Sequence, residues 1–254
     1  MRPQPAGRIA WITGAGKGIG RALAIRLAGD GWTVAASART TGDLAALASS
    51  DPSGRIHAFP LDVTAPAAVE NAVARIEADL GAIELAVLNA GTHVPVTAET
   101  FSVQTFRDLV EVNLMGQVHC LAALLPRVLA RRSGHIAVVA SLAGYRGLPT
   151  AAAYGATKAG LIAMCEALRP DLAGHGVRLT LINPGFVKTP LTDRNRFPMP
   201  FLITAEDAAD RIVRGLGGSA FEIAFPWRFA VVMKLLRILP ARLFFFVSRR
   251  MIGG

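Results

Sequence analysis

The sequence predicts an α/β fold: a doubly wound parallel sheet of seven strands with helices on both faces. Three observations lead to this prediction. Short apolar segments alternate with helical segments, the first apolar segment runs straight into a glycine-rich turn, and 52% of the 254 residues are hydrophobic against 18% charged. Strands that are apolar at almost every position are typical of a parallel sheet buried on both faces. Right-handed crossovers then place the helices on either side of that sheet.

The predicted strands are five or six residues long and largely apolar. They cover residues 8–13, 32–37, 56–61, 85–89, 135–140, 178–182 and 221–225. The predicted helices follow Gly20 and then cover residues 43–48, 66–80, 105–131, 154–174 and 204–216. Proline has no N–H group and its ring clashes with the preceding turn, so we expect Pro170 to kink its helix or to end the regular part near Arg169.

The composition argues against several classes of protein. Cys120 and Cys165 lie in apolar helical segments and form neither a disulfide framework nor a metal motif, which fits a reducing cytosol. Residues 1–7 lack the apolar segment of a secretory signal. The net charge is +9, but the basic residues are scattered, so we expect no nucleic-acid partner. No metal-ligand spacing links the histidines His57, His119, His135 and His175, and we expect no metal.

Two predicted helices are apolar nearly all round, over residues 109–129 and 151–168. A helix of this kind must be covered on more than one side. The sheet covers one face of each helix. We therefore expect a second copy of the chain to cover the other face, which predicts a homodimer.

The glycine-rich turn follows the first predicted strand and precedes the first helix, as a dinucleotide site requires. It reads Thr13-Gly14-Ala15-Gly16-Lys17-Gly18-Ile19-Gly20. Gly14 permits the tight turn, Gly18 lets the backbone approach a pyrophosphate, and Gly20 allows close packing of helix on strand. The N–H groups and the partial positive charge of the helix N-terminus favour phosphate binding at the same place.

Tyr154 and Lys158 lie four residues apart in a strongly helical segment, so their side chains leave the helix on one face. A tyrosine hydroxyl titrates near ~10, and a neighbouring ammonium lowers that pKa. The small residues Gly155 and Ala156 allow a ligand or another backbone to come close. The pair is therefore predicted to be a tuned proton donor.

Over about residues 8–225 the sequence resembles the short-chain dehydrogenase/reductase family, in its branch of soluble enzymes of similar length. The resemblance rests on several motifs that occur in the family's order. They are Thr13-Gly14-x-x-x-Gly18-Ile19-Gly20, Asp62-Val63, Asn89-Ala90-Gly91, Asn113, Ser141, Tyr154-x-x-x-Lys158 and Pro184-Gly185. The resemblance implies one NAD(P)-binding Rossmann domain over residues 1–254, with an amphipathic C-terminal extension over 227–254.

The resemblance also implies a set of catalytic residues. Tyr154 would give a proton to a carbonyl oxygen during reduction, or take one from an alcohol during oxidation. Lys158 would lower the pKa of Tyr154 and bind the nicotinamide ribose, and Ser141 would hydrogen-bond the substrate oxygen. Asn113 would hold a water that links Lys158 to solvent; a satisfied polar group within a helix is the alternative reading of Asn113.

The resemblance further implies a set of coenzyme-binding residues, spread from the glycine turn to Thr189. Asp62 and Val63 would contact the adenine, Asn89 to Gly91 would lie under the adenosine ribose, and Pro184 to Thr189 would meet the nicotinamide. The full set is Gly14, Gly16, Lys17, Gly18, Ile19, Gly20, Arg39, Asp62, Val63, Asn89, Ala90, Gly91, Tyr154, Lys158, Pro184, Gly185, Val187 and Thr189.

The choice between the two coenzymes is predicted from charge. Relatives that use NAD carry an acidic residue at the end of the second strand, which binds the ribose and repels a 2′-phosphate. Ala38 stands at this position, with Arg39 next to it and Lys17 in the glycine turn. These two cations can clamp a phosphate, so we expect NADP(H) to be preferred; solvated surface charges are the alternative.

Some positions depart from the family pattern. Leu88 stands where relatives often have a second asparagine, and the last strand leads into Pro226-Trp227 rather than into a glycine-rich ending, which puts a tetramer in doubt. His93 follows the Asn89 to Gly91 loop. It could face the substrate, but a lone histidine at such a place is more often a simple loop residue.

Two apolar segments remain beyond the nicotinamide side. Phe197, Met199, Phe201 and Leu202 offer an adaptable lid for a lipophilic substrate, or form a simple packed loop. Residues 227–252 are apolar but interrupted by basic residues and by Pro240, and they lack the ~18 uncharged residues of a spanning helix. Two short basic amphipathic helices fit better, lying on an anionic membrane surface, or packed on the active-site mouth or on a partner subunit.

The sequence thus predicts an NADP(H)-dependent oxidoreductase that interconverts a ketone or aldehyde and an alcohol, with a lipophilic substrate. A reductase of 3-oxoacyl groups on an acidic carrier protein is an alternative, favoured by the basic surface. A non-catalytic protein that senses the coenzyme or docks on a membrane is another. We expect the protein in the cytoplasm, with peripheral contact to the inner membrane surface as a further possibility.

Overall fold

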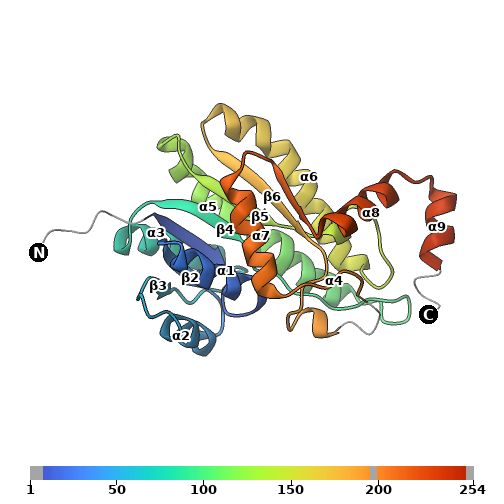
Figure 1. The fold of residues 1–254 in the computed structure, drawn as a ribbon, viewed down its shortest axis with the longest axis horizontal. Helices are drawn as coiled ribbons and strands as arrows, with labels where there is room; N and C mark the ends of the chain where they lie inside the picture. Colours follow the sequence, from blue (N-terminus) through green and yellow to red (C-terminus); the bar gives the residue numbers. More distant parts are fainter. Residues whose placement is uncertain (1–7, 195–198, 250–254) are drawn as a thin grey trace, which may run out of the picture.

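The computed structural model describes residues 8–194 and 199–249 (Figure 1). Seven parallel strands form one sheet in the order β3-β2-β1-β4-β5-β6-β7. The strands are β1 Ile9–Thr13, β2 Thr33–Ser37, β3 Ile56–Ala58, β4 Ile83–Leu88, β5 His135–Val139, β6 Arg178–Pro184 and β7 Glu222–Phe225. The strand order reverses between β1 and β4, where both strands end at the same edge. The predicted doubly wound sheet is confirmed.

Helices cover both faces of this sheet (Figure 1). They are α1 Gly18–Gly29, α2 Thr41–Ser49, α3 Pro66–Asp79, α4 Val103–Val110, α5 Gly116–Ala130, α6 Ala152–Gly174, α7 Ala205–Gly217, α8 Trp227–Ile238 and α9 Ala241–Arg249. Because side chains alternate along a strand, Trp11 enters the core on one face of β1 and Ile12 enters the core on the other. Each face thus has its own apolar core.

The two cores draw on different helices. Leu23 of α1, Leu44 of α2 and Ile212 of α7 pack on one face of the sheet. The other core takes buried side chains from four other helices: Ile76 of α3, Leu124 of α5, Leu161 of α6 and Met233 of α8. The two faces of the sheet are therefore covered by different sets of helices.

The long helix predicted over residues 105–131 is not a regular α-helix. α4 begins at Val103, where the Ser102 side chain accepts a hydrogen bond from the N–H of Thr105, and α5 begins only at Gly116. Between them Glu111–Met115 form a π-helical turn. Such turns interrupt helices at functional sites more often than elsewhere, and this one contains the predicted site residue Asn113.

The helical stretch Val103–Ala130 is long and apolar enough to cross a membrane by length and hydropathy alone. Core helices pass the same criterion. Cys120, Leu124 and Val128 of α5 are at most 2% exposed and belong to the core on one face of the sheet. This stretch is therefore accounted for as a core helix.

α6 continues through Pro170 and ends at Gly174, so the helix does not stop near Arg169. Proline removes one hydrogen bond, the one that residue 170 would donate to the carbonyl of Glu166. Leu172, beyond the proline, is 2% exposed and packs in the core. That packing holds the last turn of the helix in place.

The predicted break of the C-terminal extension at Pro240 is confirmed, because α8 and α9 lie on either side of it. The two helices form the end of the molecule far from the N-terminus (Figure 1). α8 buries Phe229, Ala230, Met233 and Leu236 against the core. The extension is thus packed on the protein along one side of α8.

Candidate active site

The glycine turn after β1 has no room for side chains at three of its glycines. Gly14 and Gly18 have φ of +66° and +55°, which L side chains rarely adopt. A Cβ on Gly20 would lie 2.3 Å from the carbonyl oxygen of Gly14. α1 starts at Gly18 with no side chain capping it, so its first N–H groups face a cradle bounded by bare backbone. This cradle fits a pyrophosphate.

Asn89 braces the glycine turn rather than facing a ligand with its side chain. Its Nδ2 donates to the carbonyl oxygens of Thr13, at 3.0 Å, and Gly14, at 3.2 Å. The hydroxyl of Thr13 accepts in return from the backbone N–H groups of Asn89 and Ala90. The ends of β1 and β4 are therefore locked together. Leu88, which departs from the family pattern, is fully buried in the core.

Lys158 lies deep beside Tyr154 in α6. Its Nζ donates to the carbonyl oxygen of Val139 at 2.9 Å and lies 5.6 Å from the centre of the Tyr154 ring. The side chain is almost inaccessible, and burial lowers the pKa of Lys158 to about 8. The predicted juxtaposition of the two residues on one face of the helix is thus present in the structure.

The pKa of Tyr154 does not move in the direction expected from its lysine neighbour. Burial raises this pKa above its usual value, and hydrogen bonding with Ser141 opposes the rise. The reason is physical: Lys158 points its ammonium at the Val139 carbonyl, and removal of the phenol from water disfavours the phenolate.

Ser141 follows β5 and points toward the same place. Its Oγ accepts from the N–H of Ala143 at 3.1 Å and donates to the carbonyl oxygen of Pro184 at 3.3 Å. The serine therefore joins the ends of β5 and β6 and interacts with Tyr154. Three of the predicted catalytic side chains, those of Ser141, Tyr154 and Lys158, converge at the carboxyl edge of the sheet.

Asn113 in the π-helical turn is fully buried and bonded on both sides. Its Oδ1 accepts from the N–H of Thr92 at 2.7 Å, and its Nδ2 donates to the Thr92 carbonyl at 2.9 Å and to the Thr157 hydroxyl at 3.2 Å. A Cβ on Gly91 would lie 3.3 Å from Asn113 Oδ1 and 3.7 Å from Lys158 Nζ. Gly91 thus separates the asparagine from the lysine.

The remaining predicted coenzyme residues surround the glycine turn. Thr189 lies against Gly18, because a Cβ there would be 2.9 Å from the Thr189 methyl. The N–H of Leu61 bonds the carbonyl of Ala38 and so brings Asp62 to the end of β2. The side chain of Val63 packs on Gly116 instead, the residue is 7% exposed, and its carbonyl oxygen lies 2.9 Å from Nδ1 of His119.

Asp43 was not among the predicted residues but lies at the predicted phosphate clamp. Its Oδ2 pairs with Nζ of Lys17 at 3.2 Å, and its Cβ lies 3.1 Å from where a Cβ of Gly16 would be. Arg39 beside it is exposed. Asp43 lies in the first turn of α2, where an acidic residue is common in any helix, so no signal in the sequence indicated a role at the clamp.

His93 packs on the predicted proton donor. Its ring centre is 4.8 Å from that of Tyr154 in an edge-on arrangement, and the residue is 7% exposed. The reading of His93 as a simple loop residue therefore missed this contact. Its position two residues after Gly91 was the available signal.

The C-terminal extension reaches the nicotinamide side of the predicted site. Phe229 of α8 approaches Gly185, where a Cβ would be 2.7 Å from its ring. Its ring also stacks on Phe186 at 5.4 Å and on Phe201 of the predicted lid at 6.0 Å. Phe197 of that lid lies outside the described residues. Packing of the extension on the active-site mouth was one of the alternatives predicted from sequence, but no pattern singled out Phe229 as the residue that forms this aromatic wall.

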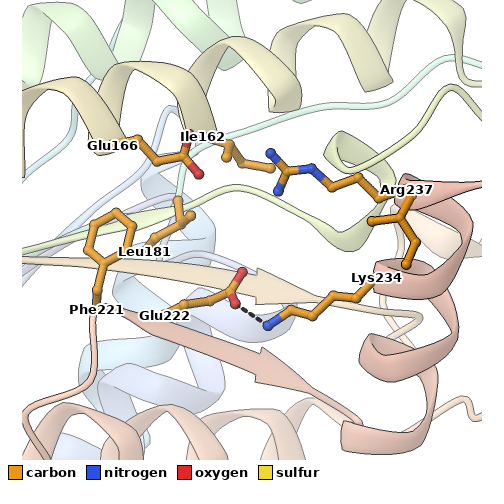
Figure 2. Close-up of a pocket in the computed structure, with 8 residues that line it drawn as sticks. Ile162, Glu166, Leu181, Phe221, Glu222, Lys234 and Arg237 are labelled. Atoms are coloured by element: carbon orange, nitrogen blue, oxygen red, sulfur yellow. Dashed lines mark hydrogen bonds and ion pairs between the residues drawn. The ribbon is translucent and has the colours of Figure 1, made fainter.

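A hydrogen-bonded cluster fastens α8 beside this wall (Figure 2). Lys234 Nζ pairs with Glu222 Oε2 at 2.6 Å, and Asn183 Nδ2 donates to Glu222 Oε1 at 2.7 Å. Burial raises the pKa of Glu222, but hydrogen bonds from Lys234, Tyr145 and Asn183 outweigh it and hold the pKa below its usual value. A cavity of about 380 Å³ adjoins the cluster between α6 and α8.

Over residues 8–194 and 199–249, no three histidine, cysteine, aspartate or glutamate side chains come together as metal ligands. The features that do converge are a bare glycine cradle at a helix N-terminus and a tyrosine-lysine pair at the same sheet edge. With the strand order, they define a dinucleotide-binding α/β protein.

Residues 8–198 match the family model described as short chain dehydrogenase, and the chain belongs to the short-chain dehydrogenase family. An uncharacterized oxidoreductase of Myxococcus xanthus (strain DK1622) is 40% identical over 246 residues, which cover 96% of this chain and 97% of the relative. Ketoacyl reductase HetN of Nostoc sp. is 30% identical over 85% of this chain and 78% of the relative. Membership makes the chain an NAD(P)-dependent dehydrogenase or reductase.

Among solved structures, a short chain dehydrogenase/reductase from Burkholderia phymatum in complex with NAD has a similar fold. The TM-score is 0.83 at 25% sequence identity, and the match covers 90% of this chain and 92% of the other. The doubly wound sheet predicted from sequence is therefore also the architecture of this relative.

Proposed function

We propose that this protein interconverts a ketone or aldehyde and an alcohol with NADP(H), and that Tyr154 is the general acid and base. The observation that carries the proposal is the convergence of Ser141, Tyr154 and Lys158 beside the glycine cradle. In reduction, the carbonyl carbon gains a hydride and its oxygen gains a proton, which yields the alcohol and the oxidised coenzyme.

The residues present fit a nicotinamide coenzyme. The bare backbone of Gly14, Gly18 and Gly20 would take the pyrophosphate, and Thr189 and Gly185 would border the nicotinamide. Asp62 would reach the adenine side through its place beside β2. When bound, the coenzyme supplies or accepts the hydride. All roles in proton transfer fall to the side chains of this chain.

Tyr154 is protonated at physiological pH, because burial raises its pKa above the usual value for tyrosine. It can therefore donate that proton to an oxygen placed between it and Ser141, whose hydroxyl stabilises the negative charge that develops there. Lys158, charged below about pH 8, favours the phenolate that remains. Asn113 fixes the Thr92 loop beside Lys158 and would hold the water that returns the proton.

The experiment that tests this proposal is the Tyr154→Phe variant. We expect kcat for reduction of a lipophilic ketone to fall by about 100- to 10,000-fold, because the proton donor is lost. The dissociation constant of NADPH, measured by fluorescence titration, should stay within about twofold. Retained turnover with retained coenzyme affinity would instead favour a different proton donor. A wild-type protein that binds NADPH but turns over no ketone or alcohol would favour the non-catalytic alternative.

The preference for NADP(H) is supported by Arg39 just after β2, by Lys17 in the glycine turn after β1, and by alanine rather than an acid at position 38. Asp43 opposes it, because its pair with Lys17 shares the charge that would bind a 2′-phosphate. The Burkholderia relative was solved with NAD, so both coenzymes occur among similar proteins.

Two variants separate these readings of the clamp. Ala38→Asp with Arg39→Ala should weaken NADPH and strengthen NADH, since a carboxylate repels the phosphate. Asp43→Asn should strengthen NADPH by several-fold, because Lys17 is released from its partner. If Asp43→Asn instead lowers the affinity for NADH more than the affinity for NADPH, Asp43 itself binds the ribose and the protein prefers NAD(H).

A lipophilic substrate is supported by the aromatic wall that Phe186, Phe201 and Phe229 build next to Gly185. The alternative, a 3-oxoacyl group carried by an acidic protein, gains from the likeness to a ketoacyl reductase and from the net charge of +9. The two substrate classes are distinguished by kcat/KM. A higher kcat/KM for free lipophilic ketones than for carrier-bound 3-oxoacyl groups would support the lipophilic substrate.

We also propose that the chain folds as one domain and works in the cytoplasm as a homodimer, without nucleic acid. The outward side of α6 supports the dimer, since five of its exposed positions are alanines, which allow a second copy to pack closely. They are Ala152, Ala156, Ala159, Ala163 and Ala167. Sedimentation velocity at micromolar concentration tests the dimer, which a single monomeric species would exclude. Peripheral membrane contact is argued next.

A further inference from the structure

The C-terminal helices present an apolar face to solvent that the proposed reaction does not use. Val231, Leu235 and Ile238 follow a helical spacing along the side of α8 opposite to its buried residues, and they are 48%, 56% and 76% exposed. On α9, Leu243 and Phe245 lie on the two flanks of the buried Phe244 and are 54% and 58% exposed. Proteins that remain free in solution rarely leave so many large apolar side chains together in water.

This face is held in a fixed position by the protein beneath it. Lys234 reaches from α8 to Glu222 (Figure 2). The guanidinium of Arg146 lies over the Phe244 ring at 4.5 Å and donates to the carbonyl oxygens of Arg237 and Leu239. The junction between α8 and α9 is therefore anchored. Little ordering is needed before the face can bind a surface.

The charge around the face has one sign. Residues 223–249 contain no aspartate or glutamate. Their basic side chains are all exposed: Arg228, Lys234, Arg237, Arg242 and Arg249. Trp227 is 65% exposed with the Arg228 guanidinium 5.5 Å from its ring. Tryptophan and arginine are residues that settle where hydrocarbon meets headgroups.

We propose that the outward face of α8 and α9 docks on a bilayer that contains anionic phospholipids. Basic residues beside a buried apolar face are attracted by such a surface. A second copy of the chain is the competing occupant. In a twofold contact the same patch meets itself, so the cations of one tail would lie against those of the other. The charge therefore favours lipid, and this inference does not depend on the reaction.

Full-length protein is tested by flotation with phosphatidylcholine vesicles, with and without about 30% phosphatidylserine. We expect binding only to the anionic vesicles, and bound protein should show quenching of Trp227 by brominated lipid. Leu235→Glu should lower binding by about tenfold or more, whereas Ile25→Glu, which adds the same charge to the exposed side of α1, should not.

The electrostatic contribution of the basic residues to vesicle binding is tested by a second pair of variants. Removing Arg242 and Arg249 together as glutamines should lower binding by about 10- to 30-fold, and removing the exposed Arg55 and Arg214 in the same way should change it little. Point variants replace deletion of the tail, because Phe229 and Met233 belong to the core.

Three results would overturn the inference. One is equal binding of the wild type to neutral and anionic vesicles. Another is equal binding of the wild type and Leu235→Glu. The third is absence of vesicle binding together with loss of a dimer in Leu235→Glu by sedimentation, which would assign the face to a second copy of the chain. The affinity for NADPH, measured in each variant, verifies that the fold is intact.

Discussion

Lys158 is a buried lysine whose burial disfavours its charged form. The residue is 3% exposed, and its ammonium donates a hydrogen bond to the carbonyl oxygen of Val139. Burial removes the ammonium of Lys158 from water and so disfavours its protonated form, which is why the pKa of Lys158 falls to about 8. Buried ionisable side chains with a shifted pKa are most common at functional sites, and Lys158 lies beside the proposed proton donor Tyr154.

The burial of Lys158 predicts how stability changes with pH. The unfolded chain binds more protons than the folded chain between about pH 8 and 10.5, so stability rises with pH across that window. Between pH 7 and 9.5 the wild type should gain about 2 kcal/mol relative to Lys158→Met. Urea unfolding of both proteins at several pH values measures this difference, and parallel curves would contradict it.

Gly20 is a position where a single methyl group cannot be placed. Its Cβ would lie 2.3 Å from a backbone oxygen, which no rotamer can relieve. We expect Gly20→Ala to cost about 2 kcal/mol or more and to weaken coenzyme binding. Gly29→Ala at the other end of α1 is the matched control. Nothing lies within 4 Å there, so it should be neutral or slightly stabilising. Equal thermal shifts in the two variants would reject the close packing.

At the scale of elements, the π-helical turn Glu111–Met115 places Asn113 where a regular helix would not. One extra residue in the turn moves the side chains on either side around the helix axis. Asn113 then bonds the Thr92 loop and α6 at once. Sequence reasoning found Asn113 through a resemblance. It did not find the turn, because hydrophobic periodicity does not distinguish a π turn inside a long apolar helix.

The bracing role of Asn113 can be measured against its neighbour Gln117. Asn113→Leu leaves the N–H and C=O of Thr92 without their partner and should cost about 2–4 kcal/mol. Gln117→Leu should cost less, since its amide has a single long hydrogen bond, to Ala90 at 3.4 Å. Chemical denaturation of both variants gives the two costs. A Gln117→Leu cost as large as that of Asn113→Leu would argue against the brace.

The elements that sequence reasoning placed well are those with strong local patterns. The strand ending at Thr13 and the helix starting at Gly18 are fixed by an apolar run and by glycines. The place of α8 was left open between a membrane and the protein. Its buried side depends on contacts with residues far away in the chain, such as Glu222 and Gly185, and no local pattern reports such contacts.

At the scale of the whole molecule, the site exists because parallel strands end at one edge. Thr13, Asn89, Ser141 and Pro184 come from four strand ends, and their side chains and carbonyls bond one another across the gaps between strands. The motifs identified these positions in sequence. The distances between them follow from the strand order β1-β4-β5-β6, which the crossover rule predicted in outline.

The parts of the site that could not be predicted come from long-range packing. Asp43 meets Lys17 and His93 meets Tyr154 only after the chain has folded. Phe229 enters from beyond the residues that the family model matches. The direction of the Tyr154 pKa also depends on burial, which the spacing of Tyr154 and Lys158 does not contain.

The central claim is that the substrate oxygen, the Tyr154 phenol and the nicotinamide meet at this edge of the sheet. A crystal structure with NADPH and an alcohol or ketone analogue measures it most directly. The account predicts the nicotinamide beside Gly185 and the analogue oxygen about 3 Å from the Tyr154 and Ser141 hydroxyls. A nicotinamide bound away from Tyr154, or an analogue oxygen held by other donors, would contradict it.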